Sequence, residues 1–210
     1  MRQETVLVPG ARDVEATLDG PVDADAIVVA CPPHPQYGGH RGDSRLTALS
    51  SDLVEEGVAC LRLDYGPWDD GRAEVEDVRN ALRWAAKRTD QVGLFGYSFG
   101  GAMAALAASS TDVRLEGVCL LAPAAQVRSD IDVAEVVQDI DAPLQVIYGE
   151  RDTTADWEPF VEAARGRRDE MDGAEQVRTK VESISGDHHF VGQVETVAGV
   201  ASAFLLDLLC

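Results

Sequence analysis

Largely apolar runs alternate with amphipathic stretches along most of the chain. The runs are short and rich in Val, Ile, Leu, Ala and Cys, which is typical of strands buried on both faces of a parallel sheet. They predict strands at 26–30, 58–63, 92–95, 117–121 and 144–148, and a last strand is expected at 177–184. Between them, apolar positions recur at helical spacing. The predicted helices cover 44–56, 72–88, 102–108, 157–171 and 191–209.

The first predicted helix carries boundary signals at both ends. Ser44 is a residue type that caps helix N-termini, and Leu46, Leu49 and Leu53 share one face of the helix that follows. Gly57 then ends the helix, because glycine readily adopts the left-handed conformation found after a last helical turn.

Two shorter strand-like runs, 5–8 and 15–19, precede this series and are separated by Pro9 and Gly10. Proline and glycine favour a turn, so these runs predict a β-hairpin at the edge of the sheet. The fold class is therefore α/β, with a mostly parallel central sheet of about seven to eight strands and helices on both faces. We expect a single domain over residues 1–210, because no repeat, low-complexity segment or linker interrupts the pattern.

The segment 122–142 departs from this pattern. It is polar and irregular, and its only sign of regular structure is one helical turn at 133–137. At about twenty residues, it lies at the upper length for a connection without a fold of its own. We therefore expect a flap here, and no separate cap domain.

Composition adds that the chain is globular and acidic. Hydrophobic residues make up 45% of the 210 residues, which suits one folded core. Acidic residues number 37 against 18 basic ones, and the formal net charge is −19. Nucleic acid is disfavoured as a partner, because phosphate contacts need a basic face. The acidic residues form no block, so we interpret them as a surface adapted to high salt, typical of a halophile, in preference to a site for a cationic partner.

The chain shows no signal for a membrane or for secretion. No apolar run reaches the length that spans a bilayer, and no apolar segment typical of a signal peptide follows the N-terminus. We therefore expect a cytoplasmic protein with no membrane partner. The cysteines form no C-x-x-C pair, which argues against a zinc or thioredoxin-like site. Cys31, Cys60 and Cys119 belong to apolar runs and are expected to be buried thiols, whereas Cys210 is expected to be exposed.

The sequence Gly96-Tyr97-Ser98-Phe99-Gly100 stands between an apolar run and an Ala-rich stretch. A G-x-S-x-G motif between a strand and a helix is typical of a nucleophile elbow, a turn so tight that the residues flanking the serine must be very small. Ser98 would then be strained, with its hydroxyl exposed at the carboxyl edge of the sheet. The motif alone also fits an ordinary glycine-rich turn, so its meaning depends on the rest of the chain.

A serine nucleophile needs a general base, and the base needs an orienting carboxylate. Asp152 follows the strand before the last, with Glu150 and Asp156 as neighbouring alternatives. His188 and His189 follow the last strand, and only one of them can face the serine because successive side chains diverge. Parallel strands end at one edge of the sheet, and the chain order serine, aspartate, histidine is that of α/β-hydrolases.

Four segments together resemble motifs of the α/β-hydrolase superfamily, in particular those of small dienelactone-hydrolase-like proteins of bacteria and archaea. They are the loop 33–39 (PHPQYGG), the elbow 96–101 (GYSFGG), the acid loop 149–152 (GERD) and the stretch 185–190 (SGDHHF). The resemblance spans essentially the whole chain and implies an α/β-hydrolase fold. It also implies that His188 is the base, since the family's base directly follows an aspartate. His189 stands where an aromatic residue is usual, and the loop 64–68 departs from the usual R-G-x-G form.

An oxyanion hole needs two hydrogen-bond donors aimed at the developing charge. The N–H of Phe99 is one candidate, and the loop after the first buried strand should supply the other. Pro35 has no N–H, so Gln36 is the expected donor and Tyr37 the alternative. We interpret His34 as a residue that shapes this loop.

These features predict a serine hydrolase that cleaves a small carboxylic ester through an acyl-enzyme on Ser98, with His188 as base and Asp152 as its orienting acid. The same triad could act on amides or thioesters, and a non-catalytic ligand-binding protein on this fold is the other alternative. The expected partner is a small acyl compound, no metal or cofactor is required, and the oligomeric state is left open. Without a cap domain the pocket should be open and shallow. Its candidate walls, or else ordinary core residues, are Tyr37, Trp68, Tyr97 and Phe99.

Overall fold

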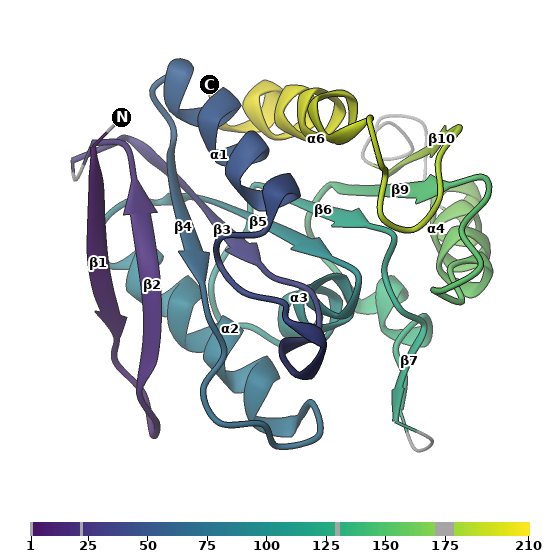
Figure 1. Ribbon diagram of the computed structural model, residues 1–210, viewed down its shortest axis with the longest axis horizontal. Helices are drawn as coiled ribbons and strands as arrows, with labels where there is room; N and C mark the ends of the chain where they lie inside the picture. Colours follow the sequence, from purple (N-terminus) through teal and green to yellow (C-terminus); the bar gives the residue numbers. More distant parts are fainter. Residues whose placement is uncertain (1, 22, 129–130, 171–178) are drawn as a thin grey trace.

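A computed structural model describes residues 2–21, 23–128, 131–170 and 179–210. One sheet holds strands in the order β1-β2-β4-β3-β5-β6-β9-β10 (Figure 1). Their bounds are β1 Gln3–Val8, β2 Val14–Asp19, β3 Ala26–Cys31, β4 Ala59–Leu63, β5 Gln91–Tyr97, β6 Gly117–Leu121, β9 Leu144–Gly149 and β10 Thr179–Ile184. The β1–β2 and β2–β4 pairs are antiparallel, and the other neighbouring pairs are parallel. The predicted mostly parallel sheet with an antiparallel hairpin at its edge is thus confirmed.

Helices cover both faces of this sheet, as predicted. Their bounds are α1 Ser44–Glu55, α2 Arg72–Ala86, α3 Phe99–Ala108, α4 Glu158–Glu170 and α6 Val194–Leu209. Helices α1 and α6 pack side by side on one face, and α2, α3 and α4 lie on the other (Figure 1). Each face has its own core, with Leu49 and Phe204 in one and Val78 and Phe160 in the other. Strands β3, β4, β5, β6 and β9 lie between the two cores and are largely buried on both sides, which explains their mostly apolar sequences.

The start of α1 differs from the prediction. Ser44 is the first helical residue, and the cap is Asp43, whose Oδ1 accepts the N–H of Arg45 at 2.9 Å. Both residue types cap helices, and the carboxylate stands one position earlier in the chain. At the other end Gly57 has a φ of +86°, as expected for a glycine that follows a helix.

The segment between β6 and β9 carries more regular structure than predicted. It contains the short strands β7 (Gln126–Arg128) and β8 (Ile131–Asp132) and the 3₁₀ helix η2 (Glu135–Asp139). Strands this short show no readable alternation, so the sequence pattern did not reveal them. The helical turn predicted at 133–137 lies two residues later. In the described part of the chain no separate cap domain covers the sheet, and this segment lies at the end of β6 (Figure 1).

The cysteines lie where the apolar pattern placed them. Cys31, Cys60 and Cys119 are buried, and Cys210 is exposed. Burial raises the pKa of the Cys60 thiol to about 12, so this group stays protonated and unreactive at neutral pH.

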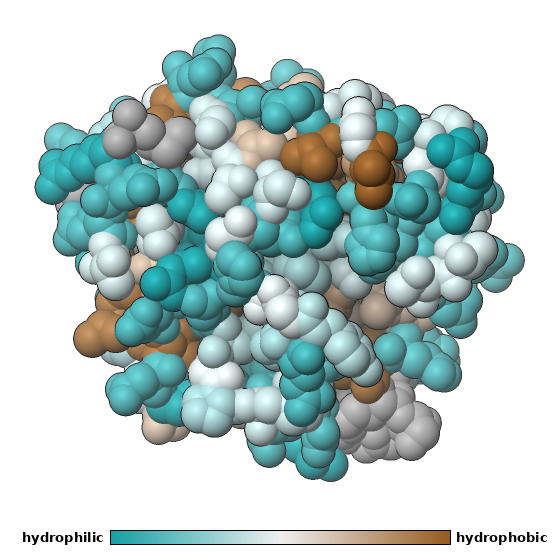
Figure 2. Space-filling view, in the orientation of Figure 1, coloured by the Kyte–Doolittle hydropathy of each residue, from teal (hydrophilic) through white to brown (hydrophobic). Residues whose placement is uncertain are grey.

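The surface is largely hydrophilic. Figure 2 shows one face on which apolar side chains are scattered in small groups. The large hydrophobic side chains that are exposed among the described residues are Leu7, Tyr37 and Val191. None of the helices in the described ranges combines the length and the apolar character needed to cross a bilayer.

Candidate active site

Ser98 lies between the last residue of β5 and the first residue of α3. Its backbone has a φ of 56° and a ψ of −119°, a conformation that residues other than glycine rarely adopt. Its N–H donates to the carbonyl oxygen of Leu121 at 2.9 Å, and its own carbonyl oxygen accepts the N–H of Gly101 at 2.9 Å. The strained turn predicted from the motif is therefore present, and bonds to β6 and α3 hold it.

Close backbone contacts explain why both of these positions in the motif are glycine. A Cβ atom on Gly96 would lie 2.2 Å from the carbonyl oxygen of Gly100. A Cβ atom on Gly100 would lie 2.3 Å from the carbonyl oxygen of Cys31, at the end of β3. The obstructing atoms belong to the backbone and cannot rotate away. The elbow thus packs against β3 at a distance that only glycine permits.

Asp152 follows β9, and its carboxylate is held on both oxygens. Oδ1 accepts the N–H groups of Thr154 at 2.8 Å and Ala155 at 3.0 Å. Oδ2 lies 2.7 Å from Nδ1 of His188. The neighbouring acids Glu150 and Asp156 are exposed, and Asp152 is buried. Of the three acids considered from the sequence, the structure brings Asp152 to the histidine.

His188 joins the acid to the serine. Its Nε2 lies 2.9 Å from Oγ of Ser98, and its Nδ1 faces the carboxylate of Asp152. A carboxylate accepts hydrogen bonds only, so the proton of the neutral imidazole resides on Nδ1 and Nε2 is free to accept the serine hydroxyl proton. His188 is buried, whereas His189 is exposed and its ring is 5.4 Å from that of His188. The structure therefore places His188, and not His189, against the serine.

The loop after β3 contains a 3₁₀ turn, η1 (Pro35–Tyr37), and its N–H groups are largely used within the loop. The N–H of Gln36 donates to Nδ1 of His34 at 3.2 Å, and that of Tyr37 donates to the carbonyl oxygen of His34 at 3.0 Å. The side chain of Gln36 points to solvent. The N–H of His34 itself has no partner among the described residues. The expected donors, Gln36 and Tyr37, are thus engaged, and a different N–H of the same loop is available.

His34 is the centre of an aromatic cluster beside the elbow. Its ring centroid lies 4.7 Å from Tyr37, 4.5 Å from Trp68 and 4.7 Å from Phe99. Burial lowers the pKa of His34, with Glu74 acting in the opposite direction. The imidazole is therefore neutral near pH 7, and its Nδ1 can accept the Gln36 N–H. His34 shapes the loop, as expected from its position.

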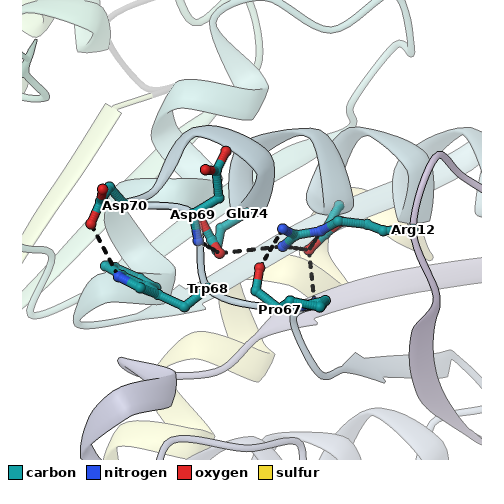
Figure 3. A network of polar contacts seen from close by, with 8 residues as sticks. Arg12, Pro67, Trp68, Asp69, Asp70 and Glu74 are labelled. Atoms are coloured by element: carbon teal, nitrogen blue, oxygen red, sulfur yellow. Dashed lines mark hydrogen bonds and ion pairs between the residues drawn. The ribbon is translucent and has the colours of Figure 1, made fainter.

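A polar network fixes the loop that carries Trp68 (Figure 3). Nε of Arg12, from the turn between β1 and β2, donates to Oδ1 of Asp77 at 2.9 Å. Nη2 of the same guanidinium donates to Oε1 of Glu74 at 3.3 Å, and this oxygen also accepts the N–H of Asp69 at 2.9 Å. Glu74 and Asp77 are buried on α2. The network ties the hairpin to the loop behind the aromatic cluster.

A cavity of about 520 Å³ opens beside the elbow. Ser98, His188, Tyr97 and Tyr37 all contribute to its wall. Tyr37 lies at the rim, because the residue is 87% exposed. Phe99 also lines the cavity, whereas Trp68, the fourth proposed wall residue, is outside the lining. The Trp68 ring packs against that of His34, and its Nε1 donates to Asp70 at 3.1 Å.

Two lining residues carry charge and were not anticipated. Asp43 caps α1 and Arg45 lies in its first turn, and the two side chains form an ion pair at the cavity wall. From the sequence they are ordinary polar residues at a helix start, and nothing in their spacing indicates proximity to the serine. In the described ranges no group of three or more His, Cys, Asp or Glu side chains is arranged to hold a metal ion.

The dienelactone hydrolase family matches this chain over residues 66–203. That range holds the elbow, the acid and the histidine described above. No curated protein sequence matches the chain.

Solved structures resemble the chain over nearly its full length. Est1E from Butyrivibrio proteoclasticus is 19% identical, with a TM-score of 0.80, over 97% of this chain and 98% of that one. A Xanthomonas campestris protein described as an α/β serine hydrolase without a lid is 20% identical, with a TM-score of 0.78, over 100% and 96%. Dienelactone hydrolase from Anabaena variabilis is 20% identical, with a TM-score of 0.77, over 100% and 99%. At these identities the similarity shows the fold, an α/β-hydrolase fold without a cap domain.

Proposed function

The chain belongs to the dienelactone hydrolase family, and on that basis we propose that it is a serine hydrolase that cleaves a small carboxylic ester through an acyl-enzyme on Ser98. The observation that carries the proposal is a pair of contacts through His188. Its Nε2 lies 2.9 Å from Oγ of Ser98, and its Nδ1 lies 2.7 Å from Oδ2 of Asp152. These distances are those of a nucleophile, its base and the group that orients the base.

In the first step Oγ of Ser98 attacks the carbonyl carbon of the substrate. Nε2 of His188 takes the hydroxyl proton as the new C–O bond forms, and the carbonyl π electrons move to the oxygen. Asp152 stabilises the imidazolium through the Nδ1 proton. When the tetrahedral intermediate collapses, His188 returns the proton to the leaving alcohol oxygen, and the acyl group stays on Ser98.

Water completes the cycle by the same route. His188 removes a proton from a water molecule, whose oxygen attacks the acyl carbon. Collapse of the second intermediate breaks the bond to Ser98, which recovers its proton from His188. The carboxylic acid then leaves, and the reaction uses only groups of the chain and water.

We assign the oxyanion hole to the N–H groups of Phe99 and His34. Phe99 is the first residue of α3, where N–H groups lack partners within the helix and the helix dipole favours negative charge. His34 lines the cavity, and its N–H is unpaired in the described part of the chain. This assignment replaces Gln36 as the second donor, because the Gln36 N–H is already bonded to Nδ1 of His34.

Two alternatives keep the fold and change the function. Ser98, His188 and Asp152 could equally hydrolyse an amide or a thioester, because these substrates differ from an ester only in the leaving group. A ligand-binding protein without catalysis uses the cavity and leaves Ser98 unreactive. The contact between Ser98 and His188 favours catalysis, because a binding protein has no need to activate a hydroxyl.

A substrate panel separates these functions. Purified protein is assayed against p-nitrophenyl acetate, an acetyl thioester and an aminoacyl amide, at low and at molar KCl. Ester hydrolysis should be the fastest, and Ser98→Ala and His188→Ala should each lower kcat by about 10³-fold or more. His189→Ala should lower it by less than about ten-fold, because its ring is exposed. Ser109→Ala removes a hydroxyl from the far end of α3 and is the matched control. Undiminished hydrolysis by Ser98→Ala would reject the proposal.

A further inference from the structure

Two successive carbonyl oxygens beside the base are held by side chains from two other elements. The hydroxyl of Tyr97 donates to the carbonyl oxygen of His188 at 2.9 Å, and this bond is buried. Nη1 of Arg45 donates to the carbonyl oxygen of His189 at 3.1 Å. Tyr97 ends β5, directly before Ser98, and Arg45 lies in the first turn of α1. The histidine loop is thus tied to the elbow and to a helix on the same side of the sheet.

Tyr97 is a reliable donor in this position. Its side chain is almost completely buried, and burial raises the pKa of its hydroxyl to about 12. The hydroxyl therefore keeps its proton at neutral pH. Its ring lies 5.5 Å from the ring of His188, so the same residue also packs against the base.

Arg45 is fixed from two sides. Its guanidinium carbon lies 4.5 Å from the centroid of the Tyr97 ring, a cation–π contact. Nη2 of Arg45 pairs with Asp43, the cap of α1. Because these two contacts already restrict the Arg45 side chain, its hydrogen bond to the carbonyl oxygen of His189 costs little further side-chain entropy. Asp43, Arg45 and Tyr97 therefore form one connected support for the loop, which we call the base-loop clamp.

The loop between β10 and α6 has features that make such support useful. Phe190 has a φ of +51° and Gly192 a φ of +72°, so the backbone departs from regular structure immediately after the histidines. β10 is the last strand of the sheet order and has a partner on one side only. A shift of the His188 peptide by about 1 Å would break the 2.9 Å contact with Ser98 Oγ and could cost about 100-fold in rate.

We infer that Tyr97 and Arg45 are positioning residues that set the imidazole of His188 for proton transfer, through hydrogen bonds to the carbonyl oxygens of His188 and His189. This inference rests on the proposed function, because it assigns a role to the clamp only if His188 is the base. Neither residue exchanges a proton with substrate. The clamp acts on the orientation of the base, and so on kcat more than on KM.

The test uses variants that remove one bond each. Tyr97→Phe removes the hydroxyl and keeps the ring, and Arg45→Met removes the guanidinium and keeps the length of the side chain. Arg45→Lys restores a donor without the planar fork that also holds Asp43. Tyr148→Phe is the control for a lost hydroxyl, because that hydroxyl makes no hydrogen bond in the described ranges and its ring stacks on Trp157.

Arg79→Met is the control for the lost guanidinium. It removes a guanidinium from α2, where the partners of Arg79 are Glu76 and Ser110.

Three measurements are made on every variant. They are kcat and KM for p-nitrophenyl acetate, the thermal unfolding midpoint, and the low-field proton signal of the Nδ1–H between His188 and Asp152. The signal reports whether the imidazole still faces the carboxylate, which a loss of global stability alone does not change.

Tyr97→Phe and Arg45→Met should each lower kcat by about 10- to 100-fold, with KM within about two-fold of the wild type and the low-field signal broadened or lost. Arg45→Lys should recover part of kcat. The controls should keep both kcat and the signal. Wild-type kcat and signal in Tyr97→Phe and Arg45→Met would overturn the inference while Ser98→Ala still abolished activity. Retained activity in Ser98→Ala would instead overturn the proposed function itself.

Discussion

Nδ1 of His188 lies 2.7 Å from Oδ2 of Asp152, and both side chains are almost completely buried. The carboxylate therefore fixes which ring nitrogen carries the proton. Asp152→Asn places an amide at the same position with nearly the same shape. An amide nitrogen donates to Nδ1 and favours the opposite tautomer, which leaves Nε2 protonated and unable to accept from Ser98. We expect kcat to fall by about 10³- to 10⁴-fold.

The measurement is steady-state hydrolysis of p-nitrophenyl acetate by Asp152→Asn, with Asp156→Asn as the control. Asp156 is an exposed acid on the same loop, so its substitution tests the effect of the lost charge alone. The control should keep kcat within a few-fold of the wild type. Equal losses in the two variants would mean that Asp152 acts through the net charge of the loop and not through His188.

Gly100→Ala tests the packing of the elbow. The added Cβ would lie 2.3 Å from the carbonyl oxygen of Cys31, so β3 and α3 must separate. We expect a loss of at least about 2 kcal/mol in the free energy of unfolding, together with loss of hydrolysis. Urea unfolding followed by circular dichroism measures the change.

Gly199→Ala in α6 is the matched control. Nothing lies within 4 Å of its added Cβ, and the position is exposed within a helix. Alanine is favoured over glycine there by about 0.5–1 kcal/mol, so this variant should be more stable than the wild type. If the two variants unfolded at the same denaturant concentration, the contact at Gly100 would not be the constraint that the distances indicate.

The parts of this fold that can be predicted from the sequence are those that depend on residues close together in the chain. The apolar runs predicted the parallel strands β3, β4, β5, β6 and β9, because these are largely apolar on both faces. The elbow, the acid and the histidine followed from motif, strand order and chain order, and the structure brings Ser98, Asp152 and His188 together. Their catalytic roles remain predictions, as do the single domain, the cytoplasmic location and the absence of a nucleic-acid or membrane partner.

What the sequence could not show depends on contacts between distant residues. Arg45 faces His189 only because α1 and the histidine loop lie on the same side of the sheet. The sequence predicts Trp68 in the pocket wall, but Trp68 packs against His34 and is not part of the cavity lining. The missing N–H of Pro35 favours Gln36 as the oxyanion donor, but the hydrogen bond from the Gln36 N–H to the His34 ring depends on the loop conformation, which the sequence does not show.

Arg12→Met tests the network of Figure 3. The buried carboxylates of Glu74 and Asp77 share this guanidinium, and the hydrogen bond to Asp77 is the main cause that raises the pKa of Arg12. Removing the cation leaves two buried acids without their charge partner. We expect the free energy of unfolding to fall by about 3–5 kcal/mol, measured by urea unfolding at pH 7.

Arg114→Met is the comparison for this variant. Arg114 pairs with Glu116, but its side chain is 85% exposed, and an exposed pair contributes less than about 1 kcal/mol. A loss in Arg12→Met no larger than in Arg114→Met would show that the network of Figure 3 does not stabilise the hairpin and the loop behind His34.

The net charge of −19 predicts a dependence of stability on salt. Repulsion among the acidic residues opposes the compact state, and the screening length falls to about 3 Å in 1 M salt. We propose that the surface is adapted to high salt, and we expect the thermal unfolding midpoint to rise from low salt to molar KCl. Sorbitol at matched osmolality is the control for water activity. A midpoint that stays flat or falls with KCl would contradict the proposal.

The central claim is that Ser98 is a nucleophile activated by His188. A fluorophosphonate probe tests it directly, because an activated serine oxygen displaces fluoride and forms a stable bond to phosphorus. After reaction and proteolysis, mass spectrometry should place the adduct on Ser98 in the wild type. Ser98→Ala should carry no adduct, and His188→Ala should label far more slowly. Folded wild-type protein that stays unlabelled, or Ser98→Ala that labels at the wild-type rate, would contradict the account.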